Sequence, residues 1–234
     1  MADTQMMGLG LLEAAQAQKH VTVNEALARI DALAARQVLS ADVAIPSAAM
    51  VDGDRFLVPN GAAEEWAGQD GRIAFRVNGG WEFAEPWTGM RVFDVSTRAW
   101  LTYDGSSWRR EVSALSVSGA ATFFRIVEIE HDVTAGATSV TSPVLPDKAL
   151  VLGVTGRVVQ ALNGVSSWAL GTADGIDRYG NGIGAAAGSF AHGVSGTPVT
   201  YFGATSLVLT AEGGSFAGGR VRLSVHFIEL APPG

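Results

Sequence analysis

The sequence predicts a mainly β protein with a short N-terminal helix, a small β-meander domain and a C-terminal β-sandwich or jelly-roll domain. Three observations lead to this prediction. Helical spacing of apolar residues occurs near the N-terminus, and short apolar runs joined by Asn-Gly or Asp-Gly fill the middle of the chain. In the C-terminal half, further short apolar runs alternate with Gly-rich turns, which is typical of a sandwich or jelly roll.

The helical pattern lies within residues 16–36. Thr22 is followed three residues later by Glu25, which is the spacing of a capping box at a helix start. The apolar stripe behind it consists of Val23, Ala26, Leu27, Ile30, Leu33 and Ala34. One short amphipathic helix is stable only when its apolar side is covered. We therefore expect the β-rich remainder of the chain, or other copies of the chain, to cover it.

Residues 1–15 carry little charge and several large apolar side chains. We expect this arm to pack against the helix or a neighbouring subunit, because exposed apolar surface is unfavourable in water. Residues 1–49 are thus interpreted as an arm and helix for attachment and oligomerisation, ending in an extended connector or edge strand around Pro46. The side chains expected to make these contacts are Leu9, Leu11, Leu12, Val23, Leu27, Ile30 and Leu33.

Residues 50–112 predict the β-meander domain. Its candidate strands are Arg55–Val58, Ile73–Val77, Trp81–Phe83, Met90–Val95 and Ala99–Tyr103. A strand followed by Asn-Gly or Asp-Gly and then Trp occurs at 77–81 and again at 103–108, which is a weak internal repeat. Five of the six tryptophans lie in this domain. They form either the core of a small sheet or a platform on which sugar rings stack.

Residues 113–119 form the expected linker, and residues 120–234 form the expected C-terminal β-sandwich domain. Its candidate strands are 122–130, 139–142, 148–155, 157–161, 166–170, 206–211 and 220–230. Between them, residues 171–196 are rich in Gly and predict a long loop. Binding residues are commonly found on a long loop carried by a packed scaffold.

A candidate carbohydrate site lies on and beside this Gly-rich segment. Sugars are bound by flat aromatic faces together with a few fixed polar groups. The candidate residues are Trp168, Asp174, Asp177, Arg178, Tyr179 and His192. Two alternatives stay open. Trp168 can belong to the core while Tyr179 anchors the loop by packing, or the binding surface can be the tryptophan-rich meander.

The composition excludes several classes of function. A net charge of −7, with no basic run beyond Arg109-Arg110, argues against nucleic acid as a partner. The chain has no Cys and its four His stand far apart, so we expect no disulfide, no metal site and no cofactor. It shows neither a secretory signal pattern nor an apolar run of membrane-spanning length. We therefore expect synthesis in the cytoplasm and no membrane insertion.

Few residues are placed to carry catalysis. Glu128 and Glu130 share one face of a predicted strand, as the two carboxylates of a glycosidase can, but a simple solvent-facing strand has the same pattern. Neither a nucleophile elbow nor another triad pattern occurs in the sequence. We therefore expect that the protein is not an enzyme.

Several sequence motifs resemble a family of phage and gene-transfer-agent structural proteins. The N-terminal signature is Gln16-Ala17-Gln18-Lys19-His20-Val21-Thr22 followed by Asn24-Glu25-Ala26-Leu27. The similarity continues through Gly53-Asp54-Arg55-Phe56, Trp66-Ala67-Gly68, Gly80-Trp81-x-Phe83-x-x-Pro86, Trp168-Ala169-Leu170-Gly171 and Arg178-Tyr179-Gly180. Gene transfer agents are phage-like particles that carry bacterial DNA. The resemblance covers most of the chain and implies a head-spike or tail-fibre role without a defined active site.

The leading hypothesis is therefore a spike or fibre subunit of a phage-like particle, a phage or a gene transfer agent. We expect a homo-oligomer, a trimer for a fibre or a pentamer on a capsid vertex. The expected partners are other particle proteins and host capsular or surface polysaccharide, and the expected location is the surface of a particle released by lysis. Two alternatives stay open: a particle-borne glycan-degrading enzyme, and a purely structural collar or adaptor. The sequence does not distinguish head from tail.

Overall fold

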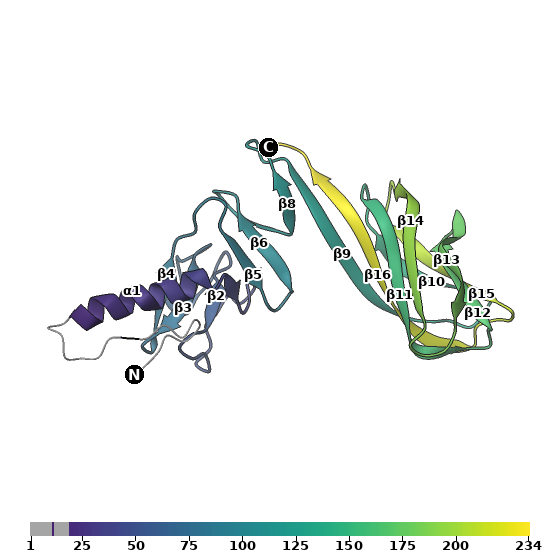
Figure 1. Cartoon of the computed structure of the whole chain (residues 1–234), viewed down its shortest axis with the longest axis horizontal. Helices are drawn as coiled ribbons and strands as arrows, with labels where there is room; N and C mark the ends of the chain where they lie inside the picture. The colour runs from purple at the N-terminus through teal and green to yellow at the C-terminus, as the bar shows by residue number, and fades with distance from the viewer. Residues whose placement is uncertain (1–10, 12–18) are drawn as a thin grey trace. The chain divides into compact units, whose positions relative to one another are not determined.

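The computed structural model describes residue 11 and residues 19–234, which divide between a unit ending at Val112 and a unit beginning at Ser113. These described residues contain one α-helix, one short 3₁₀ helix and sixteen strands (Figure 1). The predicted mainly β fold with a single short N-terminal helix is therefore confirmed.

Two small sheets form the N-terminal unit. The first has the order β2-β3-β4, with β2 at Arg55–Leu57, β3 at Ile73–Val77 and β4 at Gly80–Ala84. The second has the order β1-β5-β6-β7, with β1 at Gln37–Val38, β5 at Arg91–Asp94, β6 at Ala99–Tyr103 and β7 at Trp108–Arg110. Strand β1 pairs in parallel with β5, and the other neighbours pair antiparallel.

The strands β2-β3-β4 and β5-β6-β7 are two three-stranded meanders with the same plan. In each, the last turn contains Asn-Gly or Asp-Gly, and a Trp lies at or near the start of the last strand. Asn78 and Gly79 both have positive φ, 51° and 77°, as a type I′ hairpin turn requires. The weak internal repeat in the sequence thus corresponds to a repeated structural element.

Residues 37–40 run between the two sheets and hydrogen-bond to both. The backbone N–H of Val95, next to β5, donates to the oxygen of Val38 at 3.0 Å, and the N–H of Leu57 in β2 donates to the oxygen of Ser40 at 3.1 Å. These residues overlap only the start of the predicted connector or edge strand, since β1 ends at Val38 and residues 41–49, around Pro46, contain no strand.

Helix α1 spans Lys19–Ala34, so Thr22 lies inside the helix and the predicted capping box is wrong. The helix packs on the unit near its C-terminal end, where Asp31 and Ala32 are buried and Leu33 contacts the core. Other members of the predicted stripe face solvent. These are Val23, which is 40% exposed, Ile30, which is 52% exposed, and the exposed Ala26 and Ala34. The β-rich remainder of this unit therefore leaves that part of the stripe uncovered.

Arg55 fixes the end of α1. Its Nη1 donates to the backbone oxygen of Ala32 at 3.0 Å, and the side chain is almost fully buried. A carbonyl in the last helical turn has no intrahelical donor, and a cation is favourable at that end of the helix dipole. Burial lowers the pKa of the Arg55 guanidinium, and the negative charge of the buried Asp31 opposes this effect.

Part of the tryptophan cluster is the core of the first meander. Trp66, at the end of the 3₁₀ helix Glu64–Trp66, has no exposed surface. Its ring lies 5.3 Å from that of Phe56 and 5.0 Å from that of Trp81, centroid to centroid. The motif residues Phe56 and Trp66 are therefore core residues, and Trp81 is partly buried against them, whereas Trp87 and Trp100 are exposed.

The C-terminal unit is a jelly roll of two packed sheets. The five-stranded sheet has the order β14-β11-β16-β9-β8, and the four-stranded sheet has the order β10-β15-β12-β13. The strands are β8 (Val112–Leu115), β9 (Ala121–Asp132), β10 (Thr138–Leu145), β11 (Leu150–Asn163), β12 (Ser167–Thr172), β13 (Gly175–Gly184), β14 (Phe190–Thr200), β15 (Thr205–Glu212) and β16 (Gly218–Ala231). Apart from β8, this is the eight-strand order of a jelly roll, and the long strands stand side by side in Figure 1. Apolar side chains from both sheets form its core.

Three expectations for this unit need correction. The predicted loop at 171–196 is occupied mostly by β13 and β14. The predicted strands 148–155 and 157–161 are one long strand, β11, with register shifts against its neighbours. The predicted linker, 113–119, contains most of β8, which is an edge strand of the five-stranded sheet.

Glycines in β12 and β14 lie where the backbone of another segment comes close. These glycines therefore reflect tight packing between strands and do not indicate a loop. A Cβ added to Gly193 would lie 2.2 Å from the backbone oxygen of Tyr179, and one added to Gly171 would lie 2.0 Å from that of Gly175. Glycine inside a strand commonly marks such close approach.

Candidate functional site

The two aromatic residues of the predicted carbohydrate site lie in the jelly-roll core. Trp168 has no exposed surface, and its Nε1–H donates to the oxygen of Gly184 at 3.1 Å. Tyr179 is 2% exposed, and its hydroxyl lies 2.9 Å from that of Tyr201. Burial, with a smaller effect of Tyr201, raises the pKa of Tyr179. Neither ring offers a face to a sugar.

The polar residues of that predicted site are divided between two places. Asp174 and Arg178 form an ion pair of 2.9 Å at the hairpin between β12 and β13, close to the exposed Asp177. The Thr172 hydroxyl donates to Asp174 at 2.6 Å and is the main reason that the pKa of this carboxyl is lowered. His192 belongs to β14, in the other sheet. The six predicted residues therefore do not form one surface.

His192 lies instead in a shallow hollow of about 530 Å³ on the five-stranded sheet, beside Glu128 and Phe190. Glu128 accepts a hydrogen bond from the Ser224 hydroxyl at 3.1 Å, and Glu130 is ion-paired with Arg222. The face of β9 that carries Glu128 and Glu130 is exposed to solvent. These partners fit the simple solvent-facing interpretation of the two glutamates.

A larger hollow of about 600 Å³ lies between the two meanders of the N-terminal unit, and we call it the meander groove. It contains two aromatic side chains, five charged side chains and several small polar ones. These side chains belong to Asp42, Asn60, Asp70, Arg72, Glu85, Tyr103, Ser106, Ser107, Trp108 and Arg110. The sequence hinted at this site only through its repeated Trp, because its lining comes from many separate segments.

Tyr103 and Trp108 form the aromatic part of the groove. Their rings lie 5.3 Å apart, centroid to centroid, and both pack on the core cluster of Leu57 and Leu101. The Nε1–H of Trp108 donates to the backbone oxygen of Gly71 at 2.8 Å. This bond ties β7 to the other meander and fixes the orientation of the indole ring, which remains partly exposed.

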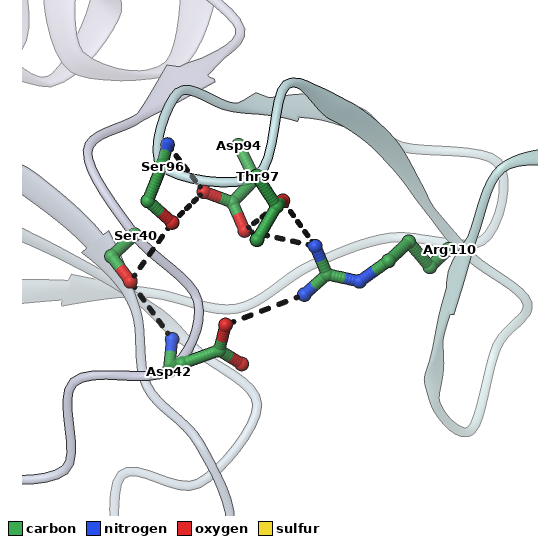
Figure 2. Close-up of polar contacts among 6 residues, drawn as sticks. All are labelled: Ser40, Asp42, Asp94, Ser96, Thr97 and Arg110. Carbon is green, nitrogen blue, oxygen red and sulfur yellow. Dashed lines mark hydrogen bonds and ion pairs between the residues drawn. The ribbon is translucent and has the colours of Figure 1, made fainter. Parts of the chain in front are cut away.

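Arg110 forms one wall of the groove and is held by a buried carboxylate (Figure 2). Asp94 has no exposed surface and lies 3.2 Å from Nη1 of Arg110. Arg110 also donates to the Thr97 hydroxyl, and its Nη2 lies 3.7 Å from the carboxylate of Asp42. The Arg110 side chain is thus held in place by its contacts with Asp94, Thr97 and Asp42.

Asp94 keeps its charge in the interior because donors surround it. Its oxygens accept from the backbone N–H of Ser96 at 3.0 Å, the Ser96 hydroxyl at 2.7 Å and the Thr97 hydroxyl at 2.8 Å. Burial by itself would raise the pKa of Asp94, but the hydrogen bonds from Ser96 and Thr97 outweigh burial and lower it. The carboxylate therefore shapes the β5–β6 turn and positions Arg110.

Asp104 orders the β6–β7 turn in the same way. Its carboxylate accepts from the backbone N–H groups of Ser106 and Ser107, at 2.8 and 2.7 Å, and from Nε of Arg109 at 2.8 Å. The Arg109 bond is the main reason that the pKa of Asp104 is lowered. Ser106 and Ser107, which line the groove, are thus held in place.

The other wall of the groove carries two acidic side chains, Glu85, which is paired with Arg72, and Asp70, which is unpaired within the described residues. Arg72 donates to Glu85 at 2.6 Å and to the side-chain oxygen of Gln69 at 2.8 Å. Asp70 and Asn60 are exposed, and within residues 19–234 neither side chain has a hydrogen bond or ion pair. These two side chains are free to interact with a ligand.

Among the described residues, no group of three or more His, Asp or Glu side chains is arranged to hold a metal ion. None of the helices in the described part of the chain combines the length and hydropathy that a bilayer crossing requires.

Residues 23–109 match the model of a family described as "Protein of unknown function (DUF2793)". This match lies within the N-terminal unit and covers less than half of the chain. None of the curated proteins matches the chain significantly. Among solved structures, the chain is similar to one titled "Cyanophage Pam1 capsid asymmetric unit", with 18% identity and a TM-score of 0.37. That match covers 56% of this chain and 98% of the other.

Proposed function

We propose that this protein is a structural subunit of a phage-like particle, a phage or a gene transfer agent. In this proposal the N-terminal segment attaches the subunit to the particle and joins copies of it. The protein then meets host capsular or surface polysaccharide from the outside of a particle released by lysis. The resemblance of the N-terminal signature to spike and fibre proteins supports this role.

The observation that carries the proposal is that the described residues leave part of the apolar stripe of α1 uncovered. The helix is anchored by its last turn, through Ala32 and the bond from Arg55, while Val23 and Ile30 face solvent. A surface helix normally turns its apolar stripe toward a packed core, so the exposed part of this stripe calls for a partner. Copies of the same chain supply a matching apolar stripe, and a closed ring of three or five copies covers all of them.

The residues predicted to make the attachment and oligomerisation contacts lie both in the N-terminal arm and in α1. Leu9 and Leu12 lie outside the described residues, and Leu11 is half-buried. Leu27 is partly exposed and Leu33 contacts the core of the unit. We therefore assign the interface mainly to Val23, Leu27 and Ile30.

We also propose a binding role and no enzymatic one. The two glutamates that resemble a glycosidase pair are exposed on one strand face and engaged with Arg222 and Ser224. A glycosidase needs carboxyl groups that flank the scissile bond, one of which is free to protonate it. Sizing the host polysaccharide after incubation with purified protein tests this directly, and shortened chains would contradict it.

Incorporation into particles tests the structural role. Val23→Gln combined with Ile30→Gln should leave the protein folded but abolish its presence in purified particles, as measured by immunoblot. Glu25→Gln combined with Arg29→Gln changes exposed polar positions of the same helix and should leave incorporation unchanged. Equal incorporation of both variants would contradict attachment through the stripe. If particles that lack the protein adsorb normally to encapsulated cells, the protein is a collar without a receptor role.

A further inference from the structure

We propose that the meander groove is a binding site for an uncharged carbohydrate chain. This inference rests on the adhesive part of the proposed function and assigns it to the N-terminal unit, whose tryptophan-rich meander is the alternative that the sequence left open beside the candidate residues of the C-terminal unit. Three features of the groove carry it: the fixed aromatic pair, the mixed set of hydrogen-bonding groups and the balance of charge.

The aromatic pair supplies a stacking surface. A volume of about 600 Å³ lies within the roughly 300–1,000 Å³ range of ligand sites, and the groove is open to solvent. The C–H faces of a sugar ring pack well on an aromatic side chain. Trp108 is already oriented by its bond to Gly71, so stacking requires no reordering of the indole ring.

The polar lining supplies both donors and acceptors, as hydroxyl groups require. Guanidinium N–H groups come from Arg72 and Arg110, and carboxylate or amide oxygens come from Asp70 and Asn60. Arg72 pairs with the exposed Glu85, and Arg110 is held by the buried Asp94, so the Arg110 side chain is ordered before a ligand arrives. Each sugar hydroxyl both donates and accepts, and it therefore matches a lining of mixed character.

The charge balance sets the ligand class. The groove is lined by the three carboxylates of Asp42, Asp70 and Glu85 and by the two guanidinium groups of Arg72 and Arg110. Both arginines are already paired with carboxylates, so an anionic ligand meets no free cation and an unpaired Asp70. An apolar ligand would strip water from these charged groups without replacing it. An uncharged, hydroxyl-rich chain meets neither penalty.

The test is a binding titration of the purified full-length protein. The probes are neutral hexasaccharides of glucose, mannose and galactose, and a hexamer of galacturonic acid as the charged counterpart. We expect tryptophan fluorescence and calorimetry to detect at least one neutral hexasaccharide. The acidic hexamer should bind at least tenfold more weakly.

The variant for this test is Asn60→Ala combined with Asp70→Ala, which removes two exposed side chains of the groove. Affinity should fall about tenfold or more, because each lost tenfold corresponds to about 1.4 kcal/mol, the value of one or two good hydrogen bonds. Glu65→Ala removes one exposed carboxylate elsewhere in the same unit and should leave affinity unchanged. Equal thermal melts establish that each variant is folded.

The outcomes separate this inference from the proposed function. Unchanged affinity in the groove variant would overturn the site while leaving polysaccharide binding by the protein in place. Preference for the acidic hexamer would overturn the ligand class. Absence of binding to every neutral probe would overturn the inference as a whole, whereas the particle role is decided separately by incorporation.

Discussion

Asp94 carries a buried charge that organises the wall of the meander groove. Both of its oxygens are used: one accepts from Ser96, and the other accepts from Thr97 and Arg110. An ionised carboxylate can accept all of these bonds, whereas a neutral amide presents one oxygen and one N–H₂ group. The chemistry of this one side chain therefore determines the β5–β6 turn and the position of Arg110.

Replacing Asp94 by Asn should destabilise the N-terminal unit. The new amide would point an N–H₂ group at donors on one side, so the buried side chain loses its hydrogen bonds either with Ser96 or with Thr97 and Arg110. We expect the free energy of unfolding to fall by about 2–3 kcal/mol, measured by denaturant titration with tryptophan fluorescence. Asp42→Asn is the control, because its contact with Arg110 is long and exposed and should be worth less than about 1 kcal/mol. Equal losses for the two variants would contradict this account.

At the level of elements, the helix, the meanders and most jelly-roll strands could be predicted from the sequence. Asn-Gly and Asp-Gly turns and alternating apolar residues have local causes, so a local pattern reveals them. The strands β13 and β14 could not be predicted, because their glycines indicate a loop in sequence and reveal close approach only in three dimensions. The side of α1 that faces the sheet was also hidden, since Arg55, which lies far from the helix in sequence, donates to the backbone oxygen of Ala32 and is buried there.

The site was less predictable than the fold. Trp168 and Tyr179 are of the residue types found in sugar sites, but β12 is buried from Trp168 to Thr172 and Tyr179 is an inward-facing residue of β13, so both side chains lie in the core. The meander groove draws its lining from segments that are distant in sequence, so its composition becomes visible only after the two meanders are placed together.

Two glycines of β14 test the explanation for this Gly-rich strand. Gly193→Ala should cost about 1–3 kcal/mol of stability, because its Cβ would meet the backbone oxygen of Tyr179 at 2.2 Å. Gly196→Ala in the same strand meets nothing within 4 Å and should be neutral or slightly stabilising. Thermal melts of the two variants provide the comparison. Similar melting temperatures would show that close approach does not explain the glycine at 193.

At the scale of the whole molecule, the chain divides into two units with separate cores. The N-terminal unit carries both the uncovered helical stripe and the meander groove, and the C-terminal unit is a jelly roll. Jelly rolls occur in capsid proteins and in lectins, but a fold alone does not establish a function. The proposed particle role therefore depends on whether the helical stripe joins copies of the chain.

The native mass of the purified full-length protein tests this most directly. Light scattering at micromolar concentration should give a trimer or a pentamer for the unmodified chain. It should give a monomer for Val23→Gln combined with Ile30→Gln, because the variant removes the apolar contact while Gln preserves the helix. The control, Glu25→Gln combined with Arg29→Gln, should keep the native mass. A monomeric unmodified protein, or an unchanged oligomer in the stripe variant, would contradict the account.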